Sequence, residues 1–225
     1  MSTAVSDQAA TSPLAGPAYL LIRRLQSLTG LIFGGYIFVH LLVNATILQG
    51  GNSYQLQVDK IHSLPFLEAI EWTAIFIPFL FHAFYGVWIA VNGRPNVANY
   101  PYRKNIYYLL QRISAVIILL FVLFHVLSLK YAVFGPELSF NANGQALETI
   151  GTHMRHNWML ATMVYPLGIL AATYHTANGL WTGAITWGLT ITARSQRQFG
   201  LVCTGLFIAT SILGMLAVVG ALHVH

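Results

Sequence analysis

Five long apolar runs, almost free of charged side chains, constrain this chain more than any other feature of its sequence. A helix of about 20 apolar residues crosses the roughly 30 Å hydrocarbon core of a bilayer. Only 8% of the 225 residues are charged and 56% are hydrophobic, whereas roughly a quarter of an ordinary soluble domain is charged. The sequence therefore predicts an all-α membrane protein with five transmembrane helices. The runs are residues 25–48, 72–93 and 113–134, with a fourth beginning at Asn157 and a fifth at Phe199.

The N-terminal segment and the single cysteine limit the kinds of domain and site that the chain can contain. Residues 1–17 are mostly small and polar, which predicts a flexible tail before one transmembrane domain at 18–225. The first apolar run is too long for the core of a cleavable signal peptide. Because Cys203 is the only cysteine, no disulfide framework, thiolate zinc site or covalent haem attachment is expected. Any haem in this chain would be b-type.

Basic residues are divided unequally between the two sides of the predicted helices. Lys and Arg in short loops mark the cytoplasmic side of a membrane protein, so the N-terminus is predicted inside and the C-terminus outside. The net charge of +5 then favours contacts with lipid headgroups, haem propionates or a cytoplasmic subunit rather than with nucleic acid. Eight of the eleven basic residues lie on the cytoplasmic side: Arg23, Arg24, Arg94, Arg103, Lys104, Arg112, Arg194 and Arg197.

Two internal repeats place one histidine in each of the first four predicted helices. A shift of 85 residues aligns the first helix with the third and His40 with His125. A shift of 93 residues aligns the second with the fourth and His82 with His175, both in the motif aromatic-His-x-x-x-Gly-x-Trp. Parallel repeats are related by an axis along the membrane normal. The sequence therefore predicts a four-helix bundle plus a fifth helix, with the first helix opposite the third and the second opposite the fourth.

The depth of each histidine in the membrane indicates which of them share a metal. His40 and His125 each lie ten residues before a glycine at the outer end, or about 15 Å at a rise of about 1.5 Å per residue. His82 and His175 each lie eighteen residues after a predicted outer helix start, or about 27 Å. Equal depths within each pair predict two stacked sites, an outer one at His40 and His125 and an inner one at His82 and His175.

Paired histidines within a membrane are typical of haem ligands. One imidazole nitrogen can bind iron while the other donates to a carbonyl, so no polar group is left unpaired. A lone histidine could equally hydrogen-bond to a neighbouring helix, but four that pair by repeat and by depth favour two haems. Two ligands per site disfavour zinc, which usually takes more. The other histidines are predicted to be solvated loop residues: His62, His153, His156, His223 and His225.

Glycines and polar residues near the predicted sites are candidates for further contacts. Gly86 and Gly179 follow the inner histidines by one helical turn and leave room for a flat macrocycle. At the outer side, Glu68, Glu71 and Arg155 could exchange protons with a quinone headgroup, although a solvated helix N-terminus explains the glutamates equally well. Four residues at inner helix ends could bind propionates or a cytoplasmic subunit, or could simply anchor the topology: Arg24, Gln26, Gln111 and Arg112.

Several stretches of the chain resemble a known family, the five-helix, di-haem cytochrome b558 subunits of succinate:quinone oxidoreductases. The likeness extends over residues 20–222, and its most specific element is His-x-x-Asn-Gly-Leu-Trp in the fourth helix. It implies a multi-pass protein of the bacterial cytoplasmic membrane whose first and third helices bind the haem distal from the catalytic subunits. The second and fourth would bind the proximal haem. The stretches are residues 64–66, 77–86, 110–113, 178–181, 186–190 and 195–197.

The resemblance also implies partners and an electron route. The partners are a flavoprotein and an iron–sulfur protein on the cytoplasmic side. Electrons would pass from the iron–sulfur protein through the inner and then the outer haem to a quinone, with menaquinone expected, and fumarate reduction would run in reverse. A higher oligomer of the complex is compatible with this arrangement.

Two other functions are compatible with buried histidines. One is the di-haem cytochrome b subunit of another membrane dehydrogenase or reductase, but that class lacks a tandem pattern with one histidine per helix at paired depths. The other is a proton-coupled transporter, which predicts broken helices and carboxylates near the membrane midplane. The apolar runs contain no such carboxylates.

Overall fold

The computed structural model describes residues 17–93 and 97–223, and within these ranges the chain is helical with no strand. The tail predicted at 1–17 lies outside the described residues, apart from Pro17, which begins the first helix. The helices in chain order are α1 (Pro17–Ala45), α2 (Gly51–His62), α3 (Leu67–Glu71), α4 (Ile77–Asn92), α5 (Arg103–Leu129), α6 (Ala146–His156), α7 (Tyr165–Thr186) and α8 (Ala193–Leu222). Short turns extend them, namely 3-10 turns at Thr46–Gln49 and Pro136–Leu138 and π turns at Trp72–Phe76 and Leu160–Val164.

Four helices in the described part of the chain are long and apolar enough to cross a membrane. They correspond to the first, second, third and fifth predicted helices. The third ends at Leu129 rather than continuing to Phe134, because Ala132 adopts a left-handed conformation (φ 51°) that turns the chain away. The fourth predicted helix is α7 with its preceding turn, and the Asn157 side chain caps its start by accepting from the amide of Met159 at 2.9 Å. The four are Leu20–Gln49, Leu67–Asn92, Arg103–Leu129 and Ala193–Leu222.

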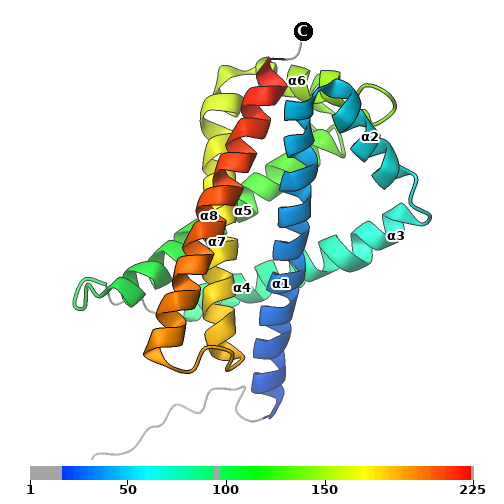
Figure 1. The fold of residues 1–225 in the computed structure, drawn as a ribbon. Helices are drawn as coiled ribbons and strands as arrows, with labels where there is room; N and C mark the ends of the chain where they lie inside the picture. The colour runs from blue at the N-terminus through cyan, green and yellow to red at the C-terminus, as the bar shows by residue number, and fades with distance from the viewer. Residues whose placement is uncertain (1–16, 94–96, 224–225) are drawn as a thin grey trace, which may run out of the picture.

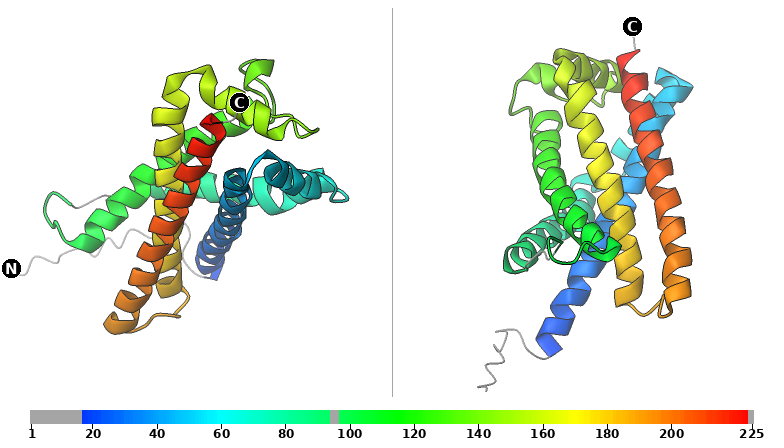
Figure 2. Two further views of the ribbon diagram at one scale, coloured as in Figure 1. Left: turned by 45° about the horizontal axis from the view of Figure 1, so that its top comes forward. Right: turned by 90° about the vertical axis from the view of Figure 1, so that its left-hand side faces the viewer.

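The four helices that carry the predicted ligands close a ring through the contacts α1–α4, α4–α5, α5–α7 and α7–α1. This order places α1 opposite α5 and α4 opposite α7, as the two sequence repeats predict. The fifth long helix, α8, packs outside the ring against α1 and α7. Figures 1 and 2 show α1, α7 and α8 side by side, with α4 and α5 running obliquely to them. The obliquity is a departure from a regular bundle.

Both histidine-bearing hairpins include a π turn that ends two residues before a proline. Pro78 and Pro166 occupy the second positions of α4 and α7. Proline has no amide hydrogen, so the carbonyl four residues earlier cannot make its usual helical bond. The turns at Trp72–Phe76 and Leu160–Val164 absorb this defect by widening. The helices therefore continue through the proline without a break.

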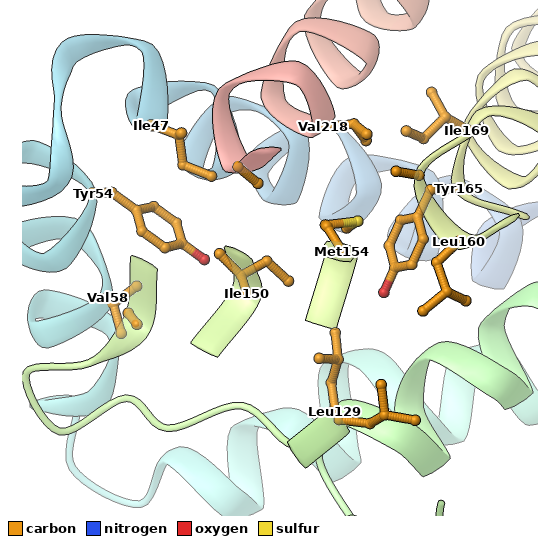
Figure 3. Close-up of a cluster of buried hydrophobic side chains, with 14 residues drawn as sticks. Ile47, Tyr54, Val58, Leu129, Ile150, Met154, Leu160, Tyr165, Ile169 and Val218 are labelled. Atoms are coloured by element: carbon orange, nitrogen blue, oxygen red, sulfur yellow. The ribbon is translucent and has the colours of Figure 1, made fainter. Parts of the chain in front are cut away.

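Two short helices that the apolar runs did not predict, α2 and α6, lie at the end of the molecule where α8 finishes (Figure 1). They contact each other, and α6 also packs on α8. Beneath them lies the main hydrophobic cluster, which brings together side chains from these helices and from the adjacent ends of the long ones (Figure 3). It includes Tyr54 of α2, Met154 of α6 and Tyr165 of α7. This cluster fixes one end of the ring of ligand-bearing helices.

Candidate functional site: two facing pairs of histidines

The inner histidine pair connects α4 to α7. The rings of His82 and His175 lie with their centroids 6.2 Å apart and their planes at 87°. Each ring donates from Nδ1 to a main-chain carbonyl, His82 to Gln26 at 2.9 Å and His175 to Gln111 at 3.1 Å. A carbonyl can only accept, so both histidines carry hydrogen on Nδ1, and Nε2 remains as an electron-pair donor. The structure thus brings together the two histidines that the 93-residue repeat paired.

The side chains of Gln26 and Gln111 form a second hydrogen bond with the same two histidines. Gln26 Nε2 donates to the carbonyl of His82 and Gln111 Nε2 donates to that of His175, both at 3.1 Å. The contact of α1 with α4 is therefore reproduced between α5 and α7. The copies differ in one respect. Gln111 Oε1 accepts from Asn178 at 2.7 Å, whereas Gln26 Oε1 is buried without a hydrogen-bond partner among the described residues.

The outer histidine pair connects α1 to α5. The rings of His40 and His125 have centroids 5.8 Å apart and planes at 88°. Tyr36 and Phe121, one turn earlier on the same helices, each place a ring 5.6 Å from the neighbouring histidine ring. Asn44 donates to the His40 carbonyl at 2.8 Å and lies 3.3 Å from His40 Nε2. The pair that the 85-residue repeat predicted is therefore also brought together.

A cavity of about 730 Å³ lies beside the inner pair and includes both of its histidines in its lining. Gly86 and Gly179 line it too, where a missing side chain was predicted to leave space. Gly30 makes the closest approach, since a Cβ built on it would lie 2.5 Å from Cε1 of His82. The volume is in the range of about 300 to 1,000 Å³ typical of ligand pockets. The open space beside His82 and His175 therefore depends on the absence of side chains at these three glycines.

The donor set of both pairs fits a haem iron. Two metal–imidazole bonds of about 2 Å each place the ring centres about 6 Å apart, close to the 6.2 and 5.8 Å of the inner and outer pairs. Within residues 17–93 and 97–223, no group of three or more His, Cys, Asp or Glu side chains could hold an ion. Zinc would need such a group, whereas a macrocycle supplies the remaining iron ligands itself.

Comparison with known proteins gives the family. No family model matches the chain. The chain is, however, 36% identical over 207 residues to the succinate dehydrogenase cytochrome b558 subunit of Bacillus subtilis (strain 168), a match that covers 91% of this chain and 98% of that relative. The chain belongs to the family of succinate dehydrogenase cytochrome b558 subunits. Its helices of membrane length make this member of the cytochrome b558 family a multi-pass membrane protein.

In this cytochrome b558 family member, the polar residues predicted at the inner helix ends make contacts within the chain. Arg112 donates to the carbonyls of Ala90 and Gly93 at 3.2 and 3.0 Å. A cation at the C-terminal end of α4 neutralises its exposed carbonyls and its dipole. Arg24 lies over the ring of Trp187, 6.0 Å from its centroid. The two glutamines hold the inner histidines, as described above. A role for any of the four toward propionates remains a prediction.

The outer polar residues lie at different helix ends. Glu71 forms an ion pair with Lys130, which follows α5. Arg155 Nη1 instead lies 3.5 Å from the carbonyl of Leu222, the last residue of α8. Glu68 is exposed in the first turn of α3. The three residues predicted to contact a quinone therefore have separate surroundings, and their role remains a prediction.

His153 is not the solvated loop residue that the sequence predicted. It lies on α6 and is 0% exposed. Its Nδ1 donates to the Leu138 carbonyl at 2.9 Å, and its Nε2 lies 2.8 Å from the hydroxyl of Tyr165. The prediction was wrong because the segment is a short helix that packs one face on the main hydrophobic cluster. His62, His156 and His223 are exposed as predicted, although His62 and His156 end helices α2 and α6 rather than lying in loops. His225 lies outside the described residues.

Six residues that contact the predicted ligands were not found from the sequence: Gly30, Tyr36, Asn44, Ser114, Phe121 and Tyr165. Ser114 Oγ lies 3.2 Å from His175 Nδ1, and the Tyr165 hydroxyl lies 3.2 Å from His125 Nδ1. Gly30 did carry a signal, because the 85-residue shift aligns it with Ala115, so a small residue recurs at this position in both copies. Tyr165 carried none, since nothing in a single-helix pattern indicates a contact across α5 and α7.

Proposed function

We propose that this chain binds two b-type haems, an inner one between His82 and His175 and an outer one between His40 and His125. The repeated geometry of the two pairs carries the proposal, because both present nearly perpendicular imidazoles at the spacing of two ligands on one iron. The Nδ1 hydrogen bonds of the inner pair leave Nε2 available. Membership of the cytochrome b558 family supports haem b as the group.

A haem held by either pair of histidines would supply one-electron transfer rather than oxygen binding, because both histidines would ligate its iron. The residues of the chain orient and shield the sites. The carbonyls and side chains of Gln26 and Gln111 fix the inner rings, and Tyr36 and Phe121 flank the outer ones. The apolar lining of the helices excludes water, and burial with fixed hydrogen bonding is what tunes a haem potential.

We infer five transmembrane helices. Four of them are the helices named above as long and apolar enough to cross a membrane, and the fifth is α7. Its place between α5 and α8 in the chain supports this, because it contacts both over its length and closes the ligand ring. The start of α1 and the end of α8 lie at opposite ends of the molecule (Figure 1). The basic residues near the α1 start favour that end as the cytoplasmic one. Residues 18–225 then form a single cytochrome b domain in the bacterial cytoplasmic membrane.

The function that follows is the membrane anchor and electron-transfer subunit of a succinate dehydrogenase. The name of the Bacillus subtilis relative supports this complex, whose flavoprotein and iron–sulfur subunits would dock at the cytoplasmic end and whose electrons would pass to menaquinone. Substrate oxidation belongs to those subunits, so the chain is the quinone-reactive part of the enzyme rather than an enzyme by itself. Membrane lipid surrounds the exposed apolar side chains of the long helices.

Glu68, Glu71 and Arg155 are the proposed quinone contacts at the outer side. Glu71 and Lys130 form an ion pair next to α3, and such a pair can exchange a proton with a hydroxyl of a reduced quinone. The test is succinate:quinone reductase activity of the whole complex with Glu71→Gln and Glu68→Gln. A raised KM for the quinone with both haem signals intact is the expected result. Unchanged kinetics in both variants would show that neither glutamate contacts the quinone.

The deciding experiment on the haems is a reduced-minus-oxidised spectrum of the purified complex and its histidine variants. His82→Ala and His175→Ala should both lose the inner haem and retain the outer one, while His40→Ala and His125→Ala should do the converse. His156→Ala, which alters an exposed histidine of α6, is the control and should retain both.

Two results would contradict the proposal. An unmodified complex with no b-type signal would exclude haem binding, and loss of the same haem from the His40 and His82 variants would refute the pairing. Co-purification separates the succinate dehydrogenase assignment from other di-haem cytochromes. A flavoprotein and an iron–sulfur protein that oxidise succinate should accompany the chain.

A further inference from the structure

The hydroxyl of Tyr165 lies between two histidines of different helices. It is 3.2 Å from Nδ1 of His125, a proposed ligand of the outer haem, and 2.8 Å from Nε2 of His153 on α6. The far side of His153 is also engaged, because its Nδ1 lies 2.9 Å from the carbonyl of Leu138. A continuous line of hydrogen bonds therefore runs from the outer ligand pair to the short helix at the outer end of the molecule.

The direction of every bond in this line follows from its last member. The Leu138 carbonyl can only accept, so His153 carries hydrogen on Nδ1 and, when neutral, offers a lone pair at Nε2. The Tyr165 hydroxyl must then donate to His153, which leaves its oxygen to accept from Nδ1 of His125. His125 consequently carries hydrogen on Nδ1 and keeps an electron pair on Nε2. The Leu138 carbonyl thus selects the tautomer of His125 through the two residues between them, His153 and Tyr165.

Burial keeps the line in this state. Tyr165 is 5% exposed and His153 is 0% exposed, and both rings pack within the main hydrophobic cluster (Figure 3 shows Tyr165 beside Leu160). Burial lowers the pKa of His153, with the nearby His156 acting in the same direction against the hydrogen bond to Leu138. A neutral His153 is the form that accepts from a tyrosine hydroxyl. The inner histidines instead donate from Nδ1 to main-chain carbonyls, and the Ser114 hydroxyl lies 3.2 Å from Nδ1 of His175.

We propose that Tyr165 and His153 are positioning residues for the outer haem, which orient His125 and strengthen it as an electron-pair donor to the iron. The inference rests on the proposed function, since it requires His125 to be a haem ligand. A hydrogen-bond acceptor on the non-ligating nitrogen increases the basicity of a ligating imidazole. A more basic ligand favours oxidised over reduced iron, so the two residues lower the midpoint potential of the outer haem and leave the inner haem unchanged.

The first experiment is a redox titration of the two haems in the purified complex with Tyr165→Phe. This change removes the hydroxyl and retains the ring that packs on Phe121 and His153. Loss of a hydrogen-bond partner of a metal ligand typically changes metal affinity about tenfold or more. A tenfold change in the preference for oxidised over reduced iron corresponds to about 59 mV for one electron. The midpoint of the outer haem should rise by about this amount and that of the inner haem should not move.

The second experiment separates a hydrogen-bond effect from a packing effect. His153→Phe removes the acceptor for Tyr165, and the outer midpoint should rise in the same direction by a smaller amount. His153→Gln supplies an amide oxygen that can accept from Tyr165, and the midpoint should return toward the unmodified value. The double variant Tyr165→Phe with His153→Phe should have the same outer midpoint as Tyr165→Phe alone, because the single change has already removed the hydrogen bonds to His125 and His153.

Tyr54→Phe is the matched control, since Tyr54 is 4% exposed in the same cluster and lies outside the hydrogen-bonded line. It should leave both midpoints unchanged. An outer midpoint that does not move in Tyr165→Phe, an equal movement of both haems, or the same shift in His153→Gln as in His153→Phe would each overturn the proposal. Failure of the proposed function looks different, because the unmodified complex would then lack two separable b-type components.

Discussion

Gln111 and His175 exchange two hydrogen bonds across α5 and α7. The histidine donates from Nδ1 to the carbonyl of the glutamine, whose side-chain amide donates to the carbonyl of the histidine, both at 3.1 Å. Gln26 and His82 make the same exchange between α1 and α4. The two copies of the hairpin thus share the orientation of the histidine ring as well as the histidine itself. A fixed orientation is what a metal ligand requires.

Removal of the two glutamine side chains should have unequal effects on the inner haem. Gln111→Leu breaks the bond to His175 and leaves the amide of Asn178 without its acceptor at 2.7 Å, a loss of about 1 to 3 kcal/mol. Gln26→Leu breaks one bond but also removes a buried oxygen that has no partner among the described residues, so its cost should be nearer to about 1 kcal/mol.

Retention of the inner haem during a detergent wash, followed by its absorbance, measures this difference. Gln49→Leu, at an exposed position in the 3-10 turn that follows α1, is the control and should retain both haems. Equal losses in Gln26→Leu and Gln111→Leu would show that the contact with Asn178 contributes nothing.

Gly30→Ala should displace the ring of His82. The added methyl group would lie 2.5 Å from Cε1 and 2.8 Å from Nδ1 of that ring, and such overpacking typically costs about 1 to 3 kcal/mol. Gly205→Ala on α8 is the control, because nothing lies within 4 Å of its added methyl group and Gly205 is not part of the cavity lining. The inner haem should be lost or become high-spin in the first variant alone, which an absorption spectrum of the oxidised complex detects. A normal spectrum for Gly30→Ala would mean that α1 shifts to make room.

Arg112→Gln should destabilise the end of α4. The guanidinium donates to the carbonyls of Ala90 and Gly93 and also bonds the hydroxyl of Tyr108, and hydrogen bonds from a charged group contribute about 1.5 to 3 kcal/mol each before solvent exposure reduces them. The midpoint of heat-induced loss of haem absorbance should fall, with the inner haem lost first. Arg103→Gln, an exposed arginine at the start of α5, should leave the midpoint unchanged, and an equal fall in both variants would point to net charge instead.

The histidine pairs could be predicted from the sequence because a ligand must recur at the same place in each copy of a duplicated hairpin. The shift of 85 residues also aligns Tyr36 with Phe121 and Gln26 with Gln111, so the contacts repeat with the ligands. The order of helices around the ring followed from the same symmetry. The oblique course of α4 and α5 did not, because crossing angles depend on how individual side chains interlock.

The outer end of the molecule was not predictable in the same way. A search for apolar runs passes over α2 and α6, whose composition is mixed and which are stabilised mainly by the cluster beneath them. His153 was assigned to solvent for that reason. Its partners, Leu138 and Tyr165, are separated from it by 15 and 12 residues, and neither spacing belongs to a helical period.

The protein should lose stability in mild acid because of His153. Burial lowers the pKa of His153 in the folded state below its ordinary value of 6.5, whereas the unfolded chain has the ordinary value. Above pH 6.5 neither state binds the proton, and the stability is fully present. As the pH falls below 6.5 the unfolded state takes up a proton that the folded state excludes, so the free energy of unfolding decreases until the lowered pKa is reached.

His153→Gln removes this titration while it keeps an acceptor for Tyr165. The midpoint of heat-induced loss of haem absorbance, measured at one heating rate between pH 7.5 and pH 5, should fall less steeply in this variant than in the unmodified complex. His156→Gln alters an exposed histidine of the same helix and should retain the steep fall. The proposed haem ligands are present in all three proteins, so their contribution cancels in the comparison. Parallel curves for the unmodified protein and His153→Gln would show that the buried histidine is not the acid-sensitive group.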